Sequence, residues 1–176
     1  MLKASDQHSG GVPKLLWAPV GAALLILIVG GAGLLWHQPL LFPSLGPTAF
    51  LQTETPQQPS AQPYNVVMGH LIGLLMGFLS VWVLGAGHAP AVLSTHELTA
   101  PRVCASVLAI GLTLAIGLLA RASHPPAAAT TLLASLGGFP PTWHSGLTVM
   151  AGVVIVALFG ELLRRIRLRQ LGDLPK

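Results

Sequence analysis

The chain has 176 residues, of which 52% are hydrophobic and 8% charged, with a formal net charge of +4 and a mean hydropathy of +0.71. This composition is typical of integral membrane proteins and excludes an ordinary soluble domain, so we expect no nucleic-acid partner. The single cysteine, Cys104, excludes an internal disulfide and a metal centre built from several thiolates. We therefore expect an all-α polytopic membrane protein in contact with lipid, with no metal and no cofactor.

Four apolar runs are long enough to cross a hydrocarbon core of roughly 30 Å, which takes on the order of 20 helical residues. They are residues 15–36, 64–85, 101–120 and 145–163. The sequence thus predicts a membrane domain of residues 15–163, with a head of residues 1–14 and a basic tail of residues 164–176. A cleaved signal peptide is the alternative for the first run, but its length favours a span.

The basic residues fall mainly on one side if the four runs alternate in direction. That topology places Lys3, Lys14, Arg102, Arg164, Arg165, Arg167, Arg169 and Lys176 with the two termini, and only Arg121 on the other side. By the positive-inside rule both termini are cytoplasmic, and we expect a bacterial inner-membrane protein. The tail is explained as a stop-transfer anchor, with binding of acidic lipid or a soluble partner as the alternative. Glu161 is expected to pair with Arg165 one turn later.

The two long connections have different compositions. Residues 52–63 are rich in Pro, Gln and Ser and predict a flexible external loop. Residues 86–100 contain His88, His96 and Glu97, which invites a metal interpretation. Without a helical His-x-x-x-His spacing, a solvated loop is the better prediction.

Two apolar segments, residues 38–51 and 123–138, are too short to cross a membrane. Sliding the chain by 82 residues places Pro43 on Pro125 and Thr48 on Thr130 without a gap. The shared order of span, Pro-led short segment, loop and span predicts a twofold internal repeat, with one unit at about residues 15–85 and the other at 101–163. With an even number of crossings each, the units are expected to be parallel.

The second short segment has the composition of a re-entrant half-helix. His124 precedes a proline and is expected to be a cap, followed by a helix over residues 125–136 about 18 Å long. Such a segment re-enters the membrane only where its backbone is buried in protein or lines a cavity. Pro125 and Pro126 lack N–H groups, so the amides of Ala127 and Ala128 are expected to be unpaired and to favour a small anion.

The first short segment supplies matching features. Ser44 and Thr48 carry hydroxyls, Gly46 is able to adopt unusual backbone angles, and Pro47 is suited to a helix start. The predicted binding residues are Ser44, Gly46, Thr48, His70, His124, Pro125, Pro126, Ala127, Ala128 and Thr130. The alternative is that Pro-Pro and Gly-Pro merely punctuate interfacial helices.

The second span carries a histidine and a glycine ladder. Ionisable residues inside spans usually face a cavity or a partner, so His70 is expected to form a proton-responsive pair with His124, or else a structural hydrogen bond. Gly69, Gly73 and Gly77 recur every four residues and predict close approach of another helix, within the subunit or in a neighbour. Four spans enclose little space, so we expect a homo-oligomer.

The chain resembles the HPP family of integral membrane proteins, named for a His-Pro-Pro motif that matches His124, Pro125 and Pro126. The segments that carry the resemblance are LFPSLGPTAF, AQPYNVVMGH and HPPAAATTLL. The resemblance implies a four-helix membrane protein, and some members are associated with nitrite transport. The chain departs from the family pattern after the motif, where Ala127 and Ala128 replace the commoner Gly-Gly.

These features predict a small-anion transporter or channel, with nitrite as the substrate that the resemblance implies. The alternative is a membrane assembly or scaffold protein whose glycine ladder packs helices and whose arginine cluster binds a partner. Enzymatic function is not expected, because no nucleophile, base and orienting group occur together.

Overall fold

The computed structural model describes residues 12–173, and every regular element within them is helical. Four long helices, α1 (Lys14–Trp36), α3 (Pro63–Val83), α5 (Ala100–Leu119) and α7 (Trp143–Leu171), are long and apolar enough to cross a membrane. Two shorter helices, α2 (Leu45–Glu54) and α6 (Ala127–Ser135), precede α3 and α7. The connection between α3 and α5 contains η3 (Ala86–His88) and α4 (Val92–Thr95), and η2 (Pro59–Ala61) precedes α3. The all-α prediction with four spans is confirmed.

Helix α7 is longer than the sequence predicted, because it continues through the arginine cluster to Leu171. Glu161 binds Arg164 and Arg165, each with a closest N–O distance of 2.6 Å, so the expected pair with Arg165 is confirmed and gains a second partner. These pairs support the helix where its apolar run ends, and Gly172, with φ of 82°, terminates it. The predicted basic tail of residues 164–176 is therefore helical as far as Leu171. Lys3 and Lys176 lie outside the described residues.

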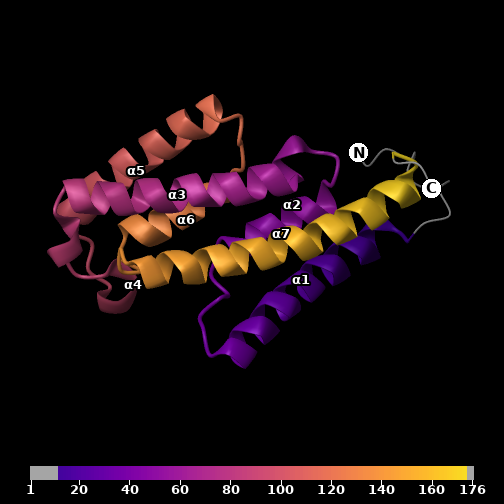
Figure 1. Cartoon of the computed structure of the whole chain (residues 1–176), viewed down its shortest axis with the longest axis horizontal. Helices are drawn as coiled ribbons and strands as arrows, with labels where there is room; N and C mark the ends of the chain where they lie inside the picture. The colour runs from indigo at the N-terminus through magenta and orange to yellow at the C-terminus, as the bar shows by residue number, and fades with distance from the viewer. Residues whose placement is uncertain (1–11, 174–176) are drawn as a thin grey trace.

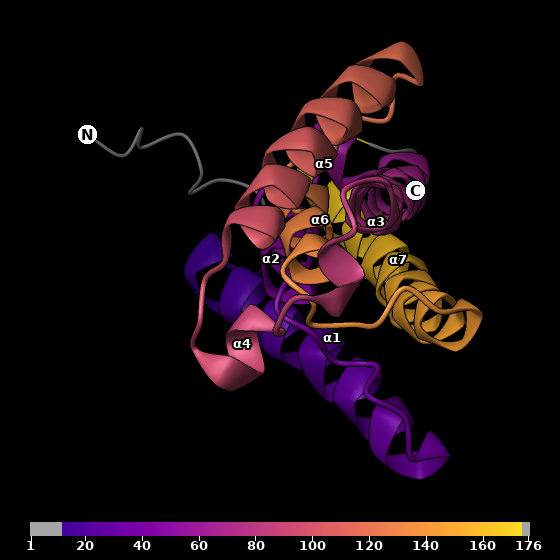
Figure 2. The same cartoon turned by 90° about the vertical axis from the view of Figure 1, so that its left-hand side faces the viewer.

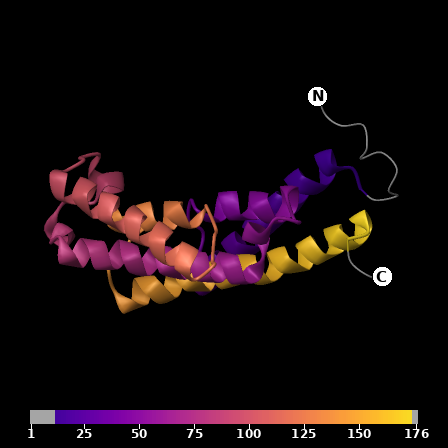
Figure 3. The ribbon, with the colours of Figure 1, turned by 90° about the horizontal axis from the view of Figure 1, so that it is seen from above.

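The two short helices lie at the centre of the molecule. Viewed along the long axis, α2 and α6 are surrounded by the long helices (Figure 2). From above they lie roughly in line, with α2 in purple and α6 in orange on either side of the middle (Figure 3). Helix α3 packs on α5 and α6, whereas α7 packs on α1 and α2. Helix α3 therefore covers the short helix α6 from the second half of the chain, and α7 covers the short helix α2 from the first half.

The main hydrophobic core lies between α1, α2 and α7. It is built from fully buried aliphatic side chains such as Leu25, Leu45, Val149 and Val153. Helices α1 and α5 bury only 22% and 17% of their membrane windows inside the chain. Most of their apolar surface is therefore available to lipid.

The direction of the long helices differs from the prediction. Lys14 at the start of α1 lies 3.6 Å from Glu54 at the end of α2, and Gln57 donates to Asp173 just beyond α7. The start of α3 follows this connection directly, so α1 and α3 both leave from the end where α7 finishes (Figure 1). Helix α2 returns the chain to the end where α1 began. The predicted topology, in which successive long helices alternate in direction, did not include this return.

Three predictions are corrected by this geometry. The connection of residues 52–63 lies at the same end of the molecule as residues 12–14 and 164–173, not at the opposite one. Arg102, at the start of α5, lies at the far end, and Arg121, just after α5, lies near the start of α3, where Tyr64 donates to the Ala120 carbonyl. Helices α1 and α5 run in opposite directions (Figure 1), so a parallel relation between two units is wrong.

Cysteine labelling tests this arrangement. In a Cys104→Ser background, Gln57→Cys and Asp173→Cys should react with a membrane-impermeant maleimide from one side of the membrane, and His88→Cys from the other. All three positions are exposed, so reactivity reports sidedness rather than burial. Labelling of Gln57→Cys from the same side as His88→Cys would contradict the fold.

Candidate functional site

The glycine ladder of α3 positions the start of α6. A Cβ on Gly69 would lie 2.7 Å from the Cβ of His124, and one on Gly77 would lie 2.6 Å from the Cβ of Ala134. Only glycine allows so close an approach between two helices. The partner of the predicted ladder is therefore α6 of the same chain, which brings His70 on α3 beside the His-Pro-Pro segment.

Five of the predicted residues meet at one buried point. Ser44, Thr48, His70, His124 and Thr130 are each at most 5% exposed and come from α3 and from the first turns of α2 and α6 or the residues just before them. Polar groups buried in a membrane protein must find partners within it. The cluster is thus a single polar site inside an apolar molecule.

The five side chains form a continuous hydrogen-bond network. Ser44 Oγ lies 2.7 Å from Thr130 Oγ1, which lies 2.6 Å from His70 Nδ1. Thr48 Oγ1 lies 3.0 Å from the Nε2 atoms of both His70 and His124. The two imidazole rings are 4.9 Å apart between centroids.

The backbone amides at the start of α6 are not free, which corrects the predicted anion site. The N–H of Ala127 donates to the His124 carbonyl at 2.9 Å, and that of Ala128 to the Pro125 carbonyl at 3.0 Å. Pro126, not His124, is the N-cap, and the helix begins at Ala127. Because Pro125 and Pro126 form a tight turn, the first amides bond back to it. Any ligand here would meet side chains instead.

The first short segment is corrected in the same way. Gly46 donates to the Pro43 carbonyl at 3.3 Å and lies within α2, without a positive φ. Its predicted use of unusual backbone angles is therefore wrong. Ser44 occupies the N-cap position of α2 but bonds through its hydroxyl to Thr130 instead of capping the helix.

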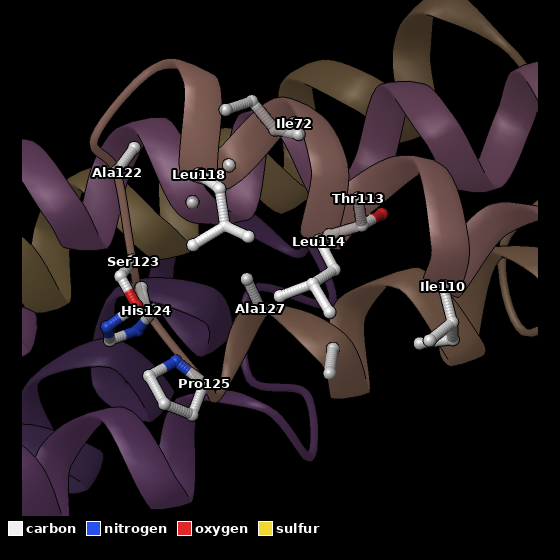
Figure 4. A pocket seen from close by; sticks show the side chains of 13 residues that line it. Ile72, Ile110, Thr113, Leu114, Leu118, Ala122, Ser123, His124, Pro125 and Ala127 are labelled. Atoms are coloured by element: carbon white, nitrogen blue, oxygen red, sulfur yellow. The ribbon is translucent and has the colours of Figure 1, made fainter.

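A cavity of about 290 Å³ opens beside the polar cluster, between α5, α3 and the start of α6. Its wall is mostly apolar, with Ile72, Leu114 and Leu118 facing the space and His124 and Ser123 at one end (Figure 4). No charged side chain lines it among the described residues. The cavity therefore forms an uncharged path to the polar cluster from the side of α5.

Ser60, which contacts the site, and Arg102, which contacts the far end of α6, have roles that the sequence did not reveal. The carbonyl of Ser60 lies 2.8 Å from His124 Nδ1, a backbone contact with no signature in residue type. Arg102, only 4% exposed, donates to the carbonyls of Ala89, Pro90 and Ser135. Ser135 is the last residue of α6, where a cation suits the helix dipole.

A family model described as "HPP, transmembrane region" matches residues 7–171. The chain belongs to the HPP family. The match covers nearly the whole chain and includes the His-Pro-Pro segment that reaches the polar cluster. No curated protein and no solved structure matches this HPP protein.

Proposed function

We propose that this HPP protein transports a small inorganic anion across the membrane, with nitrite as the substrate that the family resemblance suggests. The observation that supports the proposal is the buried polar cluster where α2 and α6 begin face to face. Buried polar groups are costly within a membrane, and they commonly mark a substrate pathway.

The hydroxyls and imidazoles are the proposed ligands, since the amides of α6 are already paired. Ser44 and Thr130 bond to each other across the two halves of the chain. Separation of α2 from α6 would free both hydroxyls, and a small anion would take the place of their mutual hydrogen bond. The Ser44–Thr130 contact is therefore the proposed gate.

The predicted internal repeat stays a proposal, and the helix directions change it from a parallel to an inverted relation between the two units. The register that pairs Thr48 with Thr130 also pairs α2 with α6, which run in opposite directions from the centre (Figure 1). Two such units would be inverted, as in many transporters whose substrate sites lie at the interface between the units.

The assembly alternative has less support. The glycine ladder is occupied by α6. Three residues of the arginine cluster are engaged within the chain, Arg164 and Arg165 with Glu161 and Arg167 with the Val12 carbonyl. Catalysis also has little support, since within the described residues the imidazoles of His70 and His124 bond to hydroxyls and a carbonyl and to no carboxylate or thiol. A homo-oligomer stays a proposal, resting on the exposed apolar surfaces of α1 and α5.

Flux measurement in proteoliposomes tests the function. Nitrite should enter vesicles containing the protein faster than empty vesicles at alkaline pH, where leakage of nitrous acid through lipid is suppressed. Equal entry into both, with and without a proton gradient, would contradict transport.

A histidine variant tests the site. His124→Ala should reduce nitrite entry by about tenfold, which corresponds to about 1.4 kcal/mol of lost stabilisation in the crossing step. His96→Ala, an exposed change in the connection before α5, is the control and should transport like the parent protein. Similar rates for His124→Ala and His96→Ala would remove His124 from the pathway.

A further inference from the structure

The hydrogen bonds of the site have a single direction when the histidines are neutral. The Ser60 carbonyl only accepts, so His124 Nδ1 donates to it over 2.8 Å. A neutral His124 then accepts at Nε2, where its partner is the Thr48 hydroxyl at 3.0 Å. Thr48 therefore donates its only proton to His124.

The same count continues through His70. Because the Thr48 proton is used, His70 Nε2 donates to Thr48, and His70 Nδ1 accepts from Thr130. Thr130 in turn accepts from Ser44. The hydrogen-bond network thus extends from the Ser44 hydroxyl to the Ser60 carbonyl, and every proton in it is assigned. His70 is protonated at Nε2 and His124 at Nδ1.

Thr48 has a second acceptor within reach. Its Oγ1 also lies 3.0 Å from the carbonyl oxygen of Ser44, one turn earlier. Rotation of the hydroxyl moves its proton from His124 to this carbonyl without displacing a heavy atom. The Nε2 lone pair of His124 is then free to take a proton, and the new N–H donates back to Thr48.

The neighbouring histidine has no such arrangement. Thr130, which donates to His70, makes hydrogen bonds only with His70 and Ser44 in the described part of the chain, and has no carbonyl to turn to. If His70 Nδ1 were protonated, Thr130 could no longer donate to it. The hydroxyl protons of Thr130 and Ser44 would then both point into the hydrogen bond that these two residues share. The structure favours His124 as the proton-binding residue.

We propose that His124 takes up one proton through rotation of Thr48, and that the anion and this proton cross the centre of the protein together. This step rests on the proposed anion transport. The proton comes from water or from the acid form of the substrate in the cavity that His124 lines. It bonds to Nε2, and the imidazolium then attracts the anion. On release the proton leaves with the anion and Thr48 turns back to Nε2.

The surroundings of His124 limit the uptake to one proton. The titratable side chain that faces it is His70 on α3, and two positive rings 4.9 Å apart would repel each other. Helix α2 contributes the Thr48 hydroxyl, the η2 turn contributes the Ser60 carbonyl, and α5 and α6 line the adjacent cavity with uncharged side chains. No acidic or basic group from these elements faces the ring within the described residues.

Nitrogen-15 NMR of the detergent-solubilised protein tests the hydrogen-bond direction without any transport assay. His70 should carry its proton on Nε2 and His124 on Nδ1, assigned with His70→Gln and His124→Gln variants. On acidification His124 should gain its second N–H before His70 does. The same tautomer for both rings, or earlier protonation of His70, would overturn the proposal.

The role of Thr48 is tested by comparing proton and anion movement in vesicles loaded with a pH-sensitive dye. The parent protein should move about one proton with each nitrite, since one imidazole binds one proton. Thr48→Val should lower this ratio toward zero, because the charged His124 loses its acceptor, whereas Thr48→Ser should restore it. Thr53→Val is the matched control: Thr53 is also buried on α2 and bonds to the carbonyl four residues earlier, but contacts no histidine.

The outcomes separate the two proposals. If the parent protein moves no nitrite, the transport function fails, while the tautomers and the NMR titration still decide the proton switch. If nitrite moves but Thr48→Val keeps the parent ratio, the switch is wrong and transport stands. If Thr48→Val abolishes flux altogether, the NMR titration decides whether the switch is right. The pH at which His124 becomes half protonated should then be lower in Thr48→Val than in Thr48→Ser.

Discussion

Gly73→Val should destabilise the protein by about 3 kcal/mol, the upper part of the range for overpacking a close contact. A Cβ on Gly73 would lie 2.7 Å from Thr131 Oγ1 and 2.8 Å from the Ala127 carbonyl oxygen. The carbonyl is backbone of α6 and cannot rotate away, so α3 and α6 would have to separate. Thermal unfolding in detergent, followed by loss of the monodisperse protein, measures the effect.

Gly111→Val provides the matched control. Gly111 lies within α5, and a Cβ added there meets nothing within 4 Å. The same substitution should therefore leave the unfolding temperature almost unchanged. Equal unfolding temperatures for the two variants would mean that α3 and α6 do not approach as closely as described.

His70→Leu should abolish most of the nitrite flux and also lower stability. The side chain is fully buried and bonds to both Thr48 and Thr130, so the change removes two hydrogen bonds and interrupts the network at its centre. At ~1 kcal/mol for each interhelical bond in a membrane, the loss of stability is roughly 2 kcal/mol. An equal loss of stabilisation in the crossing step slows flux by roughly thirtyfold.

The control for His70→Leu is His144→Leu, the same substitution at an exposed position at the start of α7. It should retain both flux and unfolding temperature. Normal flux through His70→Leu would show that the polar cluster only holds helices together and is not part of the pathway.

The two proposed roles of the cluster, as gate and as proton site, share one physical origin. Ser44 and Thr130 join α2 to α6, Thr48 joins α2 to both histidines, and Thr130 joins α6 to His70. Opening the contact between α2 and α6 therefore also interrupts the proton chain. A change at the gate and a change in protonation are coupled through these hydroxyls.

The sequence was sufficient to locate the candidate site, because its residues stand out locally. Proline pairs, hydroxyls and a histidine between long apolar runs are costly in lipid unless they meet partners. Ser44, Thr48, His70, His124 and Thr130 were all predicted on this basis and lie together. What each of them contacts could not be predicted, since the partners are up to 86 positions apart in the chain.

The backbone of the site was predicted less well. Missing N–H groups at Pro125 and Pro126 indicated a helix start with unpaired amides, but turn carbonyls of the same segment accept from Ala127 and Ala128. A tight turn competes with a ligand for these donors, and residue types do not reveal which acceptor is used. The Ser60 carbonyl escaped prediction for the same reason, because every residue carries one.

Four apolar helices and the place of the polar residues between them could be predicted from length and hydropathy, because these properties decide what can cross a membrane. The directions of those helices depend on tertiary packing and could not be predicted in the same way. Helix α2 returns the chain to the end where α1 began, so α1 and α3 leave from the same end. Composition shows that a segment is too short to span a membrane, but the depth that it reaches depends on the helices that bury it. For α2 those helices are α1 and α7, and for α6 they are α3 and α5.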